Sequence, residues 1–593
     1  MILTDLGPCL HDGGVTYRVW ALGHSTVTIH IEKPDRYKYV VKLEQAKESG
    51  YFFGIDPKGG AGDLYQVSVD GAAPIPDFVS HYQPRGVLGP SMIVDAGAFN
   101  WQSADWKRPA WNGQVIYECH VGTFTGEGTF RSAIGKLDHL VSLGITALEI
   151  MPVADWAGER NWGYDGVMLF APASAYGTPD DFRALMDACH LRGLAVILDV
   201  VFNHLGPEGN FSHQYSNYFF HEGKDNPWGQ NFNLDGPNSE PVRALLRQNI
   251  RYWLEEFRVD GFRMDATHAV HDPSPIHLLS EVADIVHQHG GFIIAEDDRN
   301  SRHILDPHEK GGWNFDAVWS DDFHHAIRVN QTGERHSFLS MFEGSSEEIG
   351  RTLQRGWLYS GEYSEFHHKP RGTPADDLAP QGFVFCISNH DQVGNRIQGA
   401  RLHESIGAAA YRALSLFLCL VPYTPMLFMG QEWGARAPFH YFTNMPEELG
   451  LKIKEGRKRE FRDRKVVADP AELETMPNPQ DEKTFLDSKI DWSELQMEKH
   501  HRLLELYRAG LGLRRELFGG VNPPRDQWQI ETDETGVVIH YNFPARAVSV
   551  YLRLKAGEST SPVSSTVLLR SNAPEFFRGS ESDGPETLVY ANR

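Results

Sequence analysis

Residues 261–265, Gly261-Phe262-Arg263-Met264-Asp265, form a short apolar segment that carries Arg263 in its middle and closes on Asp265. It is one of eight such segments between residues 115 and 430, and several of the gaps between them have the periodicity of amphipathic helices. Eight buried strands that alternate with helices predict a (β/α)8 TIM barrel. The predicted strands are 115–120, 146–151, 195–200, 261–265, 292–296, 317–321, 383–388 and 425–429.

The regions on either side of this barrel have the alternation of short β-strands. Residues 1–98 predict an N-terminal β-sandwich, and residues 501–593 predict a helix followed by an antiparallel β-domain. Residues 99–500 are assigned to the catalytic barrel. Two connections within it, 205–240 and 322–381, are longer than a barrel needs, and we expect these loops to shape a substrate cleft. The predicted fold class is therefore multidomain.

The bulk properties exclude several classes of protein. The chain has 593 residues and a net charge of −23, so its field repels phosphate backbones and nucleic acid is not an expected partner. Its five cysteines are too few for a disulfide framework in a chain of this length. The longest apolar stretch, 413–429, contains two prolines and is interpreted as a buried helix and strand, so no membrane is expected either. The start of the chain has no basic segment followed by an apolar core, which favours a cytoplasmic protein.

Carboxylates stand at the carboxyl ends of several predicted strands, which is where TIM barrels have their active sites. Asp199, Asp265 and Glu296 end three of these strands, and Asp391 follows a fourth. Two carboxylates that flank a glycosidic bond are what retaining hydrolysis requires, and a third can stabilise the positive charge that develops on the sugar ring. The sequence therefore indicates a glycoside hydrolase.

The neighbours of two carboxylates suggest different roles for them. Arg263 lies two residues before Asp265, on the same face of a strand, and a guanidinium keeps a neighbouring carboxylate ionised, as a nucleophile must be. Glu296 follows four apolar residues and precedes two aspartates, and burial beside like charges raises the pKa of a carboxyl group, which suits a general acid. Each feature alone also fits a structural role, as a buried Arg–Asp pair or as a carboxylate at a helix N-terminus.

Histidines and aromatic residues complete the predicted cleft. His204 and His390 are candidates for hydrogen bonds to sugar hydroxyls, although a single histidine at such a position is more often structural. Sugars also stack their C–H faces on aromatic rings, and roughly half of the aromatic residues near the strand ends are expected to pack inside the protein instead. Those residues are Trp156, Trp162, Tyr164, Phe202, Trp228, Phe232 and Trp319. The same mixture of His, Asp and Glu could bind a metal, but no two candidate ligands have the i, i+4 spacing of a helical metal site, so this interpretation is the weaker one.

Four stretches resemble, in order, the motif regions of the α-amylase superfamily (glycoside hydrolase family 13): 199–204, 261–268, Glu296 and 389–391. The resemblance implies that Asp265 is the nucleophile, Glu296 the general acid/base and Asp391 the residue that stabilises the transition state. It also implies a set of substrate-binding residues around these three, in which Asp199 is a supporting carboxylate and Tyr164 stacks on the sugar. The set comprises Arg263, His204, His390, Tyr164, Asp199, Trp162, His268, Trp319 and Asp322.

The chain is also similar, over nearly its whole length, to the maltooligosyltrehalose trehalohydrolases of that superfamily. The stretches that carry this similarity are 116–124, 294–300, 319–325 and 389–396. Segments 392–396 and 319–325 are the more discriminating ones, whereas Leu22 departs from the proline that the sandwich of the family usually has. The resemblance implies hydrolysis of the α-1,4 bond next to the terminal trehalose of a maltooligosyltrehalose, with release of trehalose and a maltooligosaccharide. It further implies that related α-glucans bind, and that the enzyme is coupled to a synthase that forms its substrate. Many amylases bind calcium through the asparagine of their first motif region, here Asn203, but this family is not generally taken to need calcium, so neither a metal nor another cofactor is expected.

Other functions of the same scaffold stay open at this point. A 1,4-α-glucan branching enzyme, which is a transferase, would have the same N-terminal sandwich, but segment 392–396 argues against it. A general α-amylase would share the four superfamily motifs. A glucan-binding protein without catalysis would not need Asp265, Glu296 and Asp391 all to be present, which makes this alternative remote.

Overall fold

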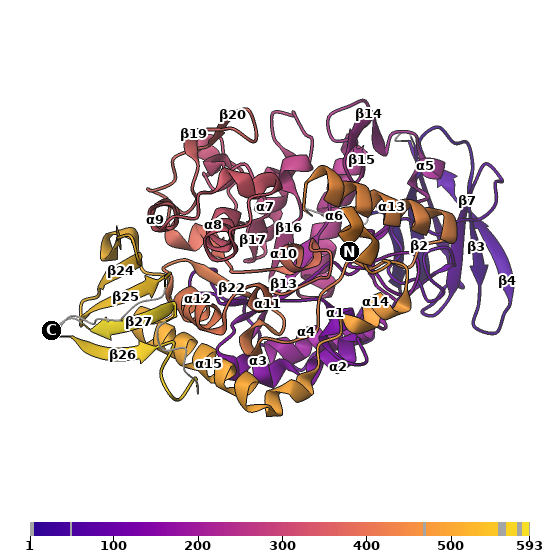
Figure 1. Cartoon of the computed structure of the whole chain (residues 1–593). Coiled ribbons are helices and arrows are strands. Elements are labelled where there is room, and N and C mark those ends of the chain that lie inside the picture. Colours follow the sequence, from indigo (N-terminus) through magenta and orange to yellow (C-terminus); the bar gives the residue numbers. More distant parts are fainter. Residues whose placement is uncertain (1–4, 48–49, 467–469, 556–564, 578–583, 592–593) are drawn as a thin grey trace.

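A closed barrel of eight parallel strands forms the centre of the chain, as the apolar segments predict (Figure 1). The computed structural model describes residues 5–47, 50–466, 470–555, 565–577 and 584–591. The strands follow the order β10-β13-β16-β17-β18-β21-β22-β9, so β9, the first in sequence, closes the ring against β22, the last. They are β9 (Ile116–Cys119), β10 (Ala147–Ile150), β13 (Ala195–Val200), β16 (Gly261–Met264), β17 (Phe292–Ala295), β18 (Ala317–Trp319), β21 (Phe383–Phe385) and β22 (Thr424–Phe428).

Every residue of these eight strands is buried. Helices cover the outside of the ring and side chains fill its inside, which explains why the strand sequences are continuous apolar runs instead of alternating ones. Charged residues within such runs are therefore exceptional. They are Glu118 in β9, Glu149 in β10, Asp199 in β13 and Arg263 in β16.

The helical segments predicted between the strands are confirmed. In α4, for example, the Thr178 side chain accepts a hydrogen bond from the backbone N–H of Asp181, and Pro179 begins the helix, so the sequence fixes the start of the element. The helices up to the last barrel strand, outside the two long connections, are α1 (Val121–Phe124), α2 (Phe130–Ile134), α3 (Leu137–Leu143), α4 (Pro179–His190), α6 (Glu240–Glu256), α7 (Leu278–Gln288), α10 (His390–Gly394), α11 (Leu402–Ser405) and α12 (Ala408–Leu420). The small strands β11 (Ala154–Asp155) and β12 (Met168–Pro172) pair with each other.

The two long connections, expected to be loops, are built largely from helices and hairpins. Each contains one antiparallel hairpin, and both hairpins project from the same end of the barrel in Figure 1. The polar sequences of these hairpins lack the apolar alternation of a half-buried strand, which is why the sequence did not predict them. The elements are α5 (Ser212–Tyr215), β14 (Phe220–Asn226) and β15 (Gly229–Phe232) in the first connection, and α8 (Asp321–Thr332), α9 (Ser346–Arg355), β19 (Ser360–Ser364) and β20 (Lys369–Gly372) in the second.

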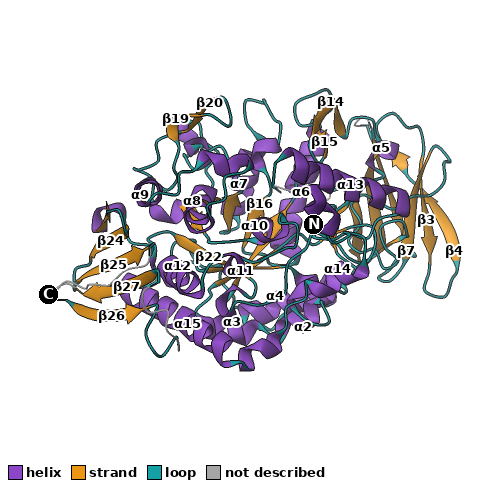
Figure 2. Cartoon of the chain, in the orientation of Figure 1, coloured by secondary structure: helices purple, strands orange, loops and turns teal. Residues whose placement is uncertain are grey.

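Antiparallel sheets lie at both ends of the molecule, with the barrel between them (Figure 2). Two four-stranded sheets, β1-β2-β6-β5 and β4-β3-β7-β8, form the predicted N-terminal sandwich, and one five-stranded sheet, β23-β24-β25-β27-β26, lies at the C-terminal end. The first two sheets comprise β1 (Gly7–His11), β2 (Gly14–Trp20), β3 (Val27–Glu32), β4 (Lys38–Lys42), β5 (Glu44–Gln45), β6 (Tyr51–Asp56), β7 (Leu64–Val69) and β8 (Ser91–Met92). The third comprises β23 (Trp528–Thr532), β24 (Gly536–Asn542), β25 (Ala547–Arg553), β26 (Thr566–Arg570) and β27 (Glu586–Ala591).

The C-terminal part of the chain fastens the turn between α12 and β22. Helix α13 (Glu447–Asp463), α14 (Glu482–Asp487) and α15 (Glu498–Phe518) follow the barrel, and α15 packs against α12. From α15, Arg514 donates hydrogen bonds to the carbonyl oxygens of Val421 at 2.6 Å and Tyr423 at 2.7 Å. The hydroxyl of Tyr541 in β24 donates to the carbonyl oxygen of Leu420 at 2.6 Å. The last barrel strand is therefore held by residues that come more than ninety positions later.

Cys119, Cys189, Cys386 and Cys419 are buried free thiols, and Cys9 is a partly exposed free thiol. The apolar stretch 413–429 forms a helix and a strand, as interpreted from its prolines. Within the described part of the chain, no helix is both long and apolar enough to cross a membrane. At the start of the chain, where no secretion signal is expected, residues 1–4 lie outside the described residues.

Candidate active site

Arg263 stands at the centre of the carboxylates that the strand ends bring together. Its side chain is fully buried, and its Nη1 donates hydrogen bonds to Asp199 Oδ2 and Asp265 Oδ1, both at 2.8 Å. Its Nη2 donates to Glu296 Oε2 at 2.6 Å. The register of the strands explains this arrangement, because Asp199 lies directly opposite Arg263 across the β13–β16 pair. One cation thus joins three carboxylates from neighbouring strands.

Asp265 is held in the ionised form. Besides Arg263, the side-chain amide of Asn203 donates a hydrogen bond to its Oδ2 at 2.8 Å. Burial raises the pKa of this carboxyl group, but the positive charge of Arg263 and the hydrogen bond from Asn203 outweigh burial, so its pKa is lowered from the ordinary value. A carboxylate that stays charged and holds a fixed orientation has the properties of a nucleophile.

Glu296 behaves in the opposite way. Burial is the largest cause that raises its pKa well above the usual value, and the negative charges of Asp265 and Asp391 add to it against the effect of Arg263. Its Oε2 also accepts a hydrogen bond at 3.0 Å from the backbone N–H of Ala266, whose φ of 40° turns the chain sharply after Asp265. A carboxyl group that keeps its proton near neutral pH can act as a general acid.

Asp391 is more exposed than the other two and is oriented by its own motif. Its backbone N–H is bound by the Asn389 side chain at 2.9 Å, and Asn395 Nδ2 donates to Asp391 Oδ1 at 3.1 Å. Asn395 is in turn fixed by Arg457 of α13, which donates to its Oδ1 at 2.9 Å. The next residue, Arg396, belongs to a different network, in which it pairs with Glu334. Asn395 and Arg396 therefore belong to separate networks, and Asn395 acts on a proposed catalytic carboxylate.

His390 lies between the carboxylate cluster and the wall of the barrel. Its Nε2 is 3.0 Å from the hydroxyl of Tyr164, and the two rings are stacked with centroids 5.3 Å apart. The Tyr164 hydroxyl also donates to Asp199 Oδ2 at 2.7 Å. On the other side of the imidazole, Glu118 accepts hydrogen bonds from its Nδ1 at 2.5 Å and from the His390 backbone N–H at 3.0 Å. Tyr164 and His390 are thus joined to the same network as Arg263.

Aromatic rings line the same region, as the sequence predicts. The guanidinium of Arg263 lies over the ring of Trp319, with its carbon 4.2 Å from the ring centroid, and Trp162 contacts His390 edge-on at 5.7 Å. At the turn of the β14–β15 hairpin, Trp228 is 51% exposed and lies 6.3 Å from the ring of His204. Five of the seven aromatic candidates are buried, more than the roughly half that were expected to pack inside the protein. They are Trp156, Trp162, Phe202, Phe232 and Trp319.

Comparison with known proteins agrees with this geometry. Residues 112–238 match the family described as Alpha amylase, catalytic domain. The malto-oligosyltrehalose trehalohydrolase of Rhizobium sp. (strain M-11) is 42% identical over 514 residues, which cover 85% of each chain. That of Saccharolobus solfataricus is 41% identical over 508 residues, 86% of each chain. The chain belongs to the malto-oligosyltrehalose trehalohydrolase family. The crystal structure of a Salmonella typhimurium protein assigned to the alpha amylases, 34% identical, superposes over all of both chains with a TM-score of 0.90.

Two predicted binding residues of this trehalohydrolase-family chain lie away from the three central carboxylates. Asp322 is buried, and its hydrogen bonds run to Arg371 Nη1 at 2.9 Å, to the backbone N–H of Leu358 at 2.8 Å and to Asn300 Nδ2 at 2.5 Å. These contacts hold the second hairpin, because Arg371 belongs to β20. His268 is at the surface near Trp228, with ring centroids 6.3 Å apart, so it faces the first hairpin.

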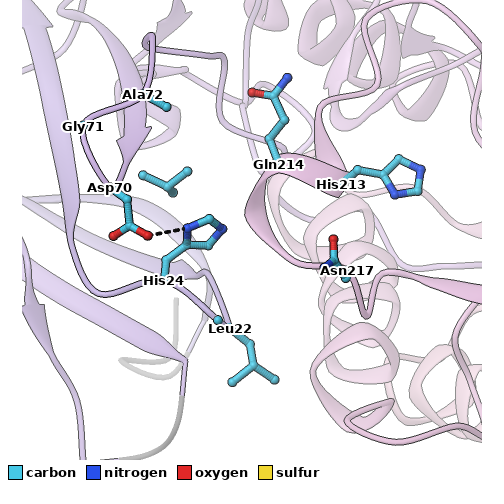
Figure 3. A pocket seen from close by; sticks show the side chains of 10 residues that line it. Leu22, His24, Asp70, Gly71, Ala72, His213, Gln214 and Asn217 are labelled. Atoms are coloured by element: carbon cyan, nitrogen blue, oxygen red, sulfur yellow. Dashed lines mark hydrogen bonds and ion pairs between the residues drawn. The ribbon is translucent and has the colours of Figure 1, made fainter.

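A separate cleft of about 580 Å³ lies between the N-terminal sandwich and α5 (Figure 3). His24 and Asp70 form an ion pair at 3.0 Å on one side of it, and His213 and Gln214 line the other. None of its lining residues is one of the predicted site residues. Among the residues that the structure describes, no group of three or more His, Cys, Asp or Glu side chains is arranged to hold a metal ion.

Sequence reasoning missed several residues that hold the site. Glu118 was noted only as part of a family stretch, Asn203 only as the position through which many amylases bind calcium, and Asn395 only within segment 392–396. Glu118 did give a signal, since a carboxylate in the middle of a buried barrel strand needs a partner. The contact of Arg457 with Asn395 gave none, because it joins positions 62 residues apart.

Proposed function

We propose that Asp265 and Glu296 carry out a two-step retaining hydrolysis of the α-1,4 bond next to the terminal trehalose of a maltooligosyltrehalose. The observation that carries this proposal is the bridge made by Arg263, which contacts both carboxyl groups while their pKa values move in opposite directions. A lowered pKa fits Asp265 as the nucleophile, and a raised pKa fits Glu296 as the general acid. The chain is accordingly a trehalose-releasing glycoside hydrolase.

In the first step, Asp265 attacks the anomeric carbon while Glu296 gives its proton to the oxygen of the leaving trehalose. The bond to trehalose breaks and a covalent maltooligosaccharyl ester forms on Asp265. In the second step, Glu296, now ionised, takes a proton from water, and the resulting oxygen attacks the same carbon. The maltooligosaccharide leaves, Asp265 is again a carboxylate and Glu296 is again protonated.

The remaining residues bind and orient the sugar in this proposal. Asp391 stabilises the positive charge that develops at the anomeric centre, and Tyr164 stacks on the sugar at the cleavage point. The other members of the set provide hydrogen bonds, ring contacts or support for these two. They are Arg263, His204, His390, Asp199, Trp162, Trp319 and His268. Asp322 has a supporting role, because its oxygens are taken up within the protein.

The test gives purified protein maltopentaosyl-trehalose and maltoheptaose side by side, with products identified by chromatography. We expect fast release of trehalose from the first substrate and little cleavage of the second. Asp265→Asn and Glu296→Gln should each lower turnover by roughly 10³-fold or more, because each removes a group that acts as a unit with the other. Near wild-type activity in either variant would refute the assignment of roles.

A glucan branching enzyme remains the second candidate. Branched products from amylose without trehalose release would favour it, and equal cleavage of both oligosaccharides would favour a general α-amylase. We further propose that the protein acts in the cytoplasm and that a maltooligosyltrehalose-forming synthase supplies its substrate, with related α-glucans as other ligands. The net charge of −23 supports the view that neither nucleic acid nor an anionic membrane is a partner.

A further inference from the structure

We infer that Glu118 is a positioning residue that keeps His390 in its doubly protonated, cationic form beside Asp391. This inference rests on the proposed function, because it concerns how one residue of the proposed sugar-binding set is prepared. Glu118 itself is 1% exposed and lies on β9, behind His390, so its side chain acts through the imidazole.

Within the part of the chain that the structure describes, both hydrogen bonds of the Glu118 side chain are made with His390. Oε1 faces His390 Nδ1 at 2.5 Å, and Oε2 accepts the His390 backbone N–H at 3.0 Å. A carboxylate cannot donate a hydrogen bond, so the proton of the first contact belongs to Nδ1. Because Glu118 binds both the backbone N–H and the ring nitrogen of His390, it also fixes the orientation of the imidazole.

The second ring nitrogen is a donor for an independent reason. The single hydroxyl proton of Tyr164 is directed to Asp199 Oδ2 at 2.7 Å, so the Tyr164 oxygen can only accept from His390 Nε2 at 3.0 Å. The other polar atom near Nε2 is Asp391 Oδ1 at 3.5 Å, which is also an acceptor. Both ring nitrogens therefore carry protons, and the ring is an imidazolium.

The titratable and charged groups around His390 come from most sides of the barrel. Those that favour the imidazolium are the carboxylates, and those that oppose it are the cations and the burial of the ring. They are Glu118 on β9, Glu149 on β10, Asp199 on β13, Arg263 on β16 and, beside the ring, Asp391, Tyr164 and His120. Burial is the largest single cause and lowers the pKa of His390, but the charges of Glu118 and Asp391 and the hydrogen bond to Glu118 together outweigh it and raise that pKa to about 9.

Glu149 provides a matched control for Glu118. The two glutamates lie opposite each other in the register of β9 and β10, and both are buried. Neither side-chain oxygen of Glu149 has a hydrogen-bond partner among the described residues, and burial followed by the charge of Glu118 raises its pKa well above the usual value. Burial and the charge of Glu118 both favour the neutral form of Glu149, so glutamine is the matched neutral replacement at this position.

The experiment compares the pH dependence of kcat/KM for wild type, Glu118→Gln and Glu149→Gln. An imidazolium with a raised pKa is present below that pKa and is lost as the pH rises through it. Without the carboxylate of Glu118, the imidazolium should be lost about one to three pH units lower. The pH above which kcat/KM falls should therefore decrease by this amount, while kcat/KM at more acidic pH returns to the wild-type value. Glu149→Gln should leave the pH of this fall unchanged.

Two results would overturn the inference. One is a loss in Glu118→Gln by the same factor at every pH, which a purely structural role would give, and the other is an unmoved profile. A histidine-labelled nitrogen NMR spectrum at pH 8 adds a direct readout, in which a doubly protonated ring should be present in wild type and missing from both Glu118→Gln and His390→Gln. The profiles are recorded on whichever glucan the wild type hydrolyses, so a failure of trehalose release would refute the proposed function without deciding the role of Glu118.

Discussion

Replacement of Arg263 by leucine would leave three carboxyl groups near one another without their shared cation. Arg263 is within 2.8 Å of Asp199, Asp265 and Glu296, and it is the main cause that holds down the pKa of Asp265 against burial. Removal of an opposite charge at this distance raises a carboxyl pKa by about one to three units. Leaving a buried charge without its partner also costs about 3–5 kcal/mol of unfolding free energy.

This variant is tested by measuring the decrease of kcat/KM at acidic pH and the melting temperature. In wild type the lowered pKa keeps Asp265 ionised down to acidic pH. Activity is therefore lost only when the pH falls through the lowered pKa of Asp265. In Arg263→Leu we expect this loss to occur about one to three pH units higher, because Asp265 takes up a proton more easily. Arg371→Leu is a matched control, because Arg371 is buried and pairs with Asp322 at 2.9 Å. If both variants lose stability and neither changes the pH at which kcat/KM decreases, the electrostatic account of Asp265 is wrong.

Three further predictions follow from the contacts around the site. Asn395→Ala should lower kcat by about tenfold with an unchanged melting temperature, because it removes one hydrogen bond from Asp391, worth about 1.5 kcal/mol with a charged acceptor; an unchanged kcat would exclude this role. Trp228→Ala should raise KM by up to about tenfold and change kcat less, since a stacking contact of about 1 kcal/mol is lost; steady-state kinetics on the trehalose-ended substrate decide this. Dialysis against EDTA should leave turnover unchanged, and a loss restored by calcium would show a metal requirement.

The barrel and the carboxylates at its strand ends could be predicted from the sequence because the strands are buried on both faces. Continuous apolar runs that end on Asp265 or Glu296 are visible without any tertiary information. The hairpins of the long connections could not be predicted, since polar strands such as 220–226 are defined by their pairing partner and not by their own pattern.

The contacts of the residues that support the site could not be predicted from the sequence either. Asp322 stands in a discriminating family stretch and was expected to bind substrate, but it contacts Arg371 and Leu358, which lie 49 and 36 residues further along the chain. Nothing in the local sequence distinguishes a carboxylate that faces a sugar from one that anchors a hairpin. Glu118 was predictable in part: its position inside a buried strand indicated that it has a partner, but did not identify that partner as His390.

The fastening of the turn between α12 and β22 bears on the order in which the molecule can assemble on the ribosome. The ring closes only when β22 pairs with β9, and more than 300 residues separate these two strands. Until then β9 is an open edge that exposes unpaired backbone groups. Arg514 and Tyr541 are made later still, so the seam can close before the residues that fasten it have been synthesised. Helix α15 and the C-terminal sheet therefore stabilise a ring that has already closed, and their removal should lead to a barrel that forms but reopens at the β22–β9 seam.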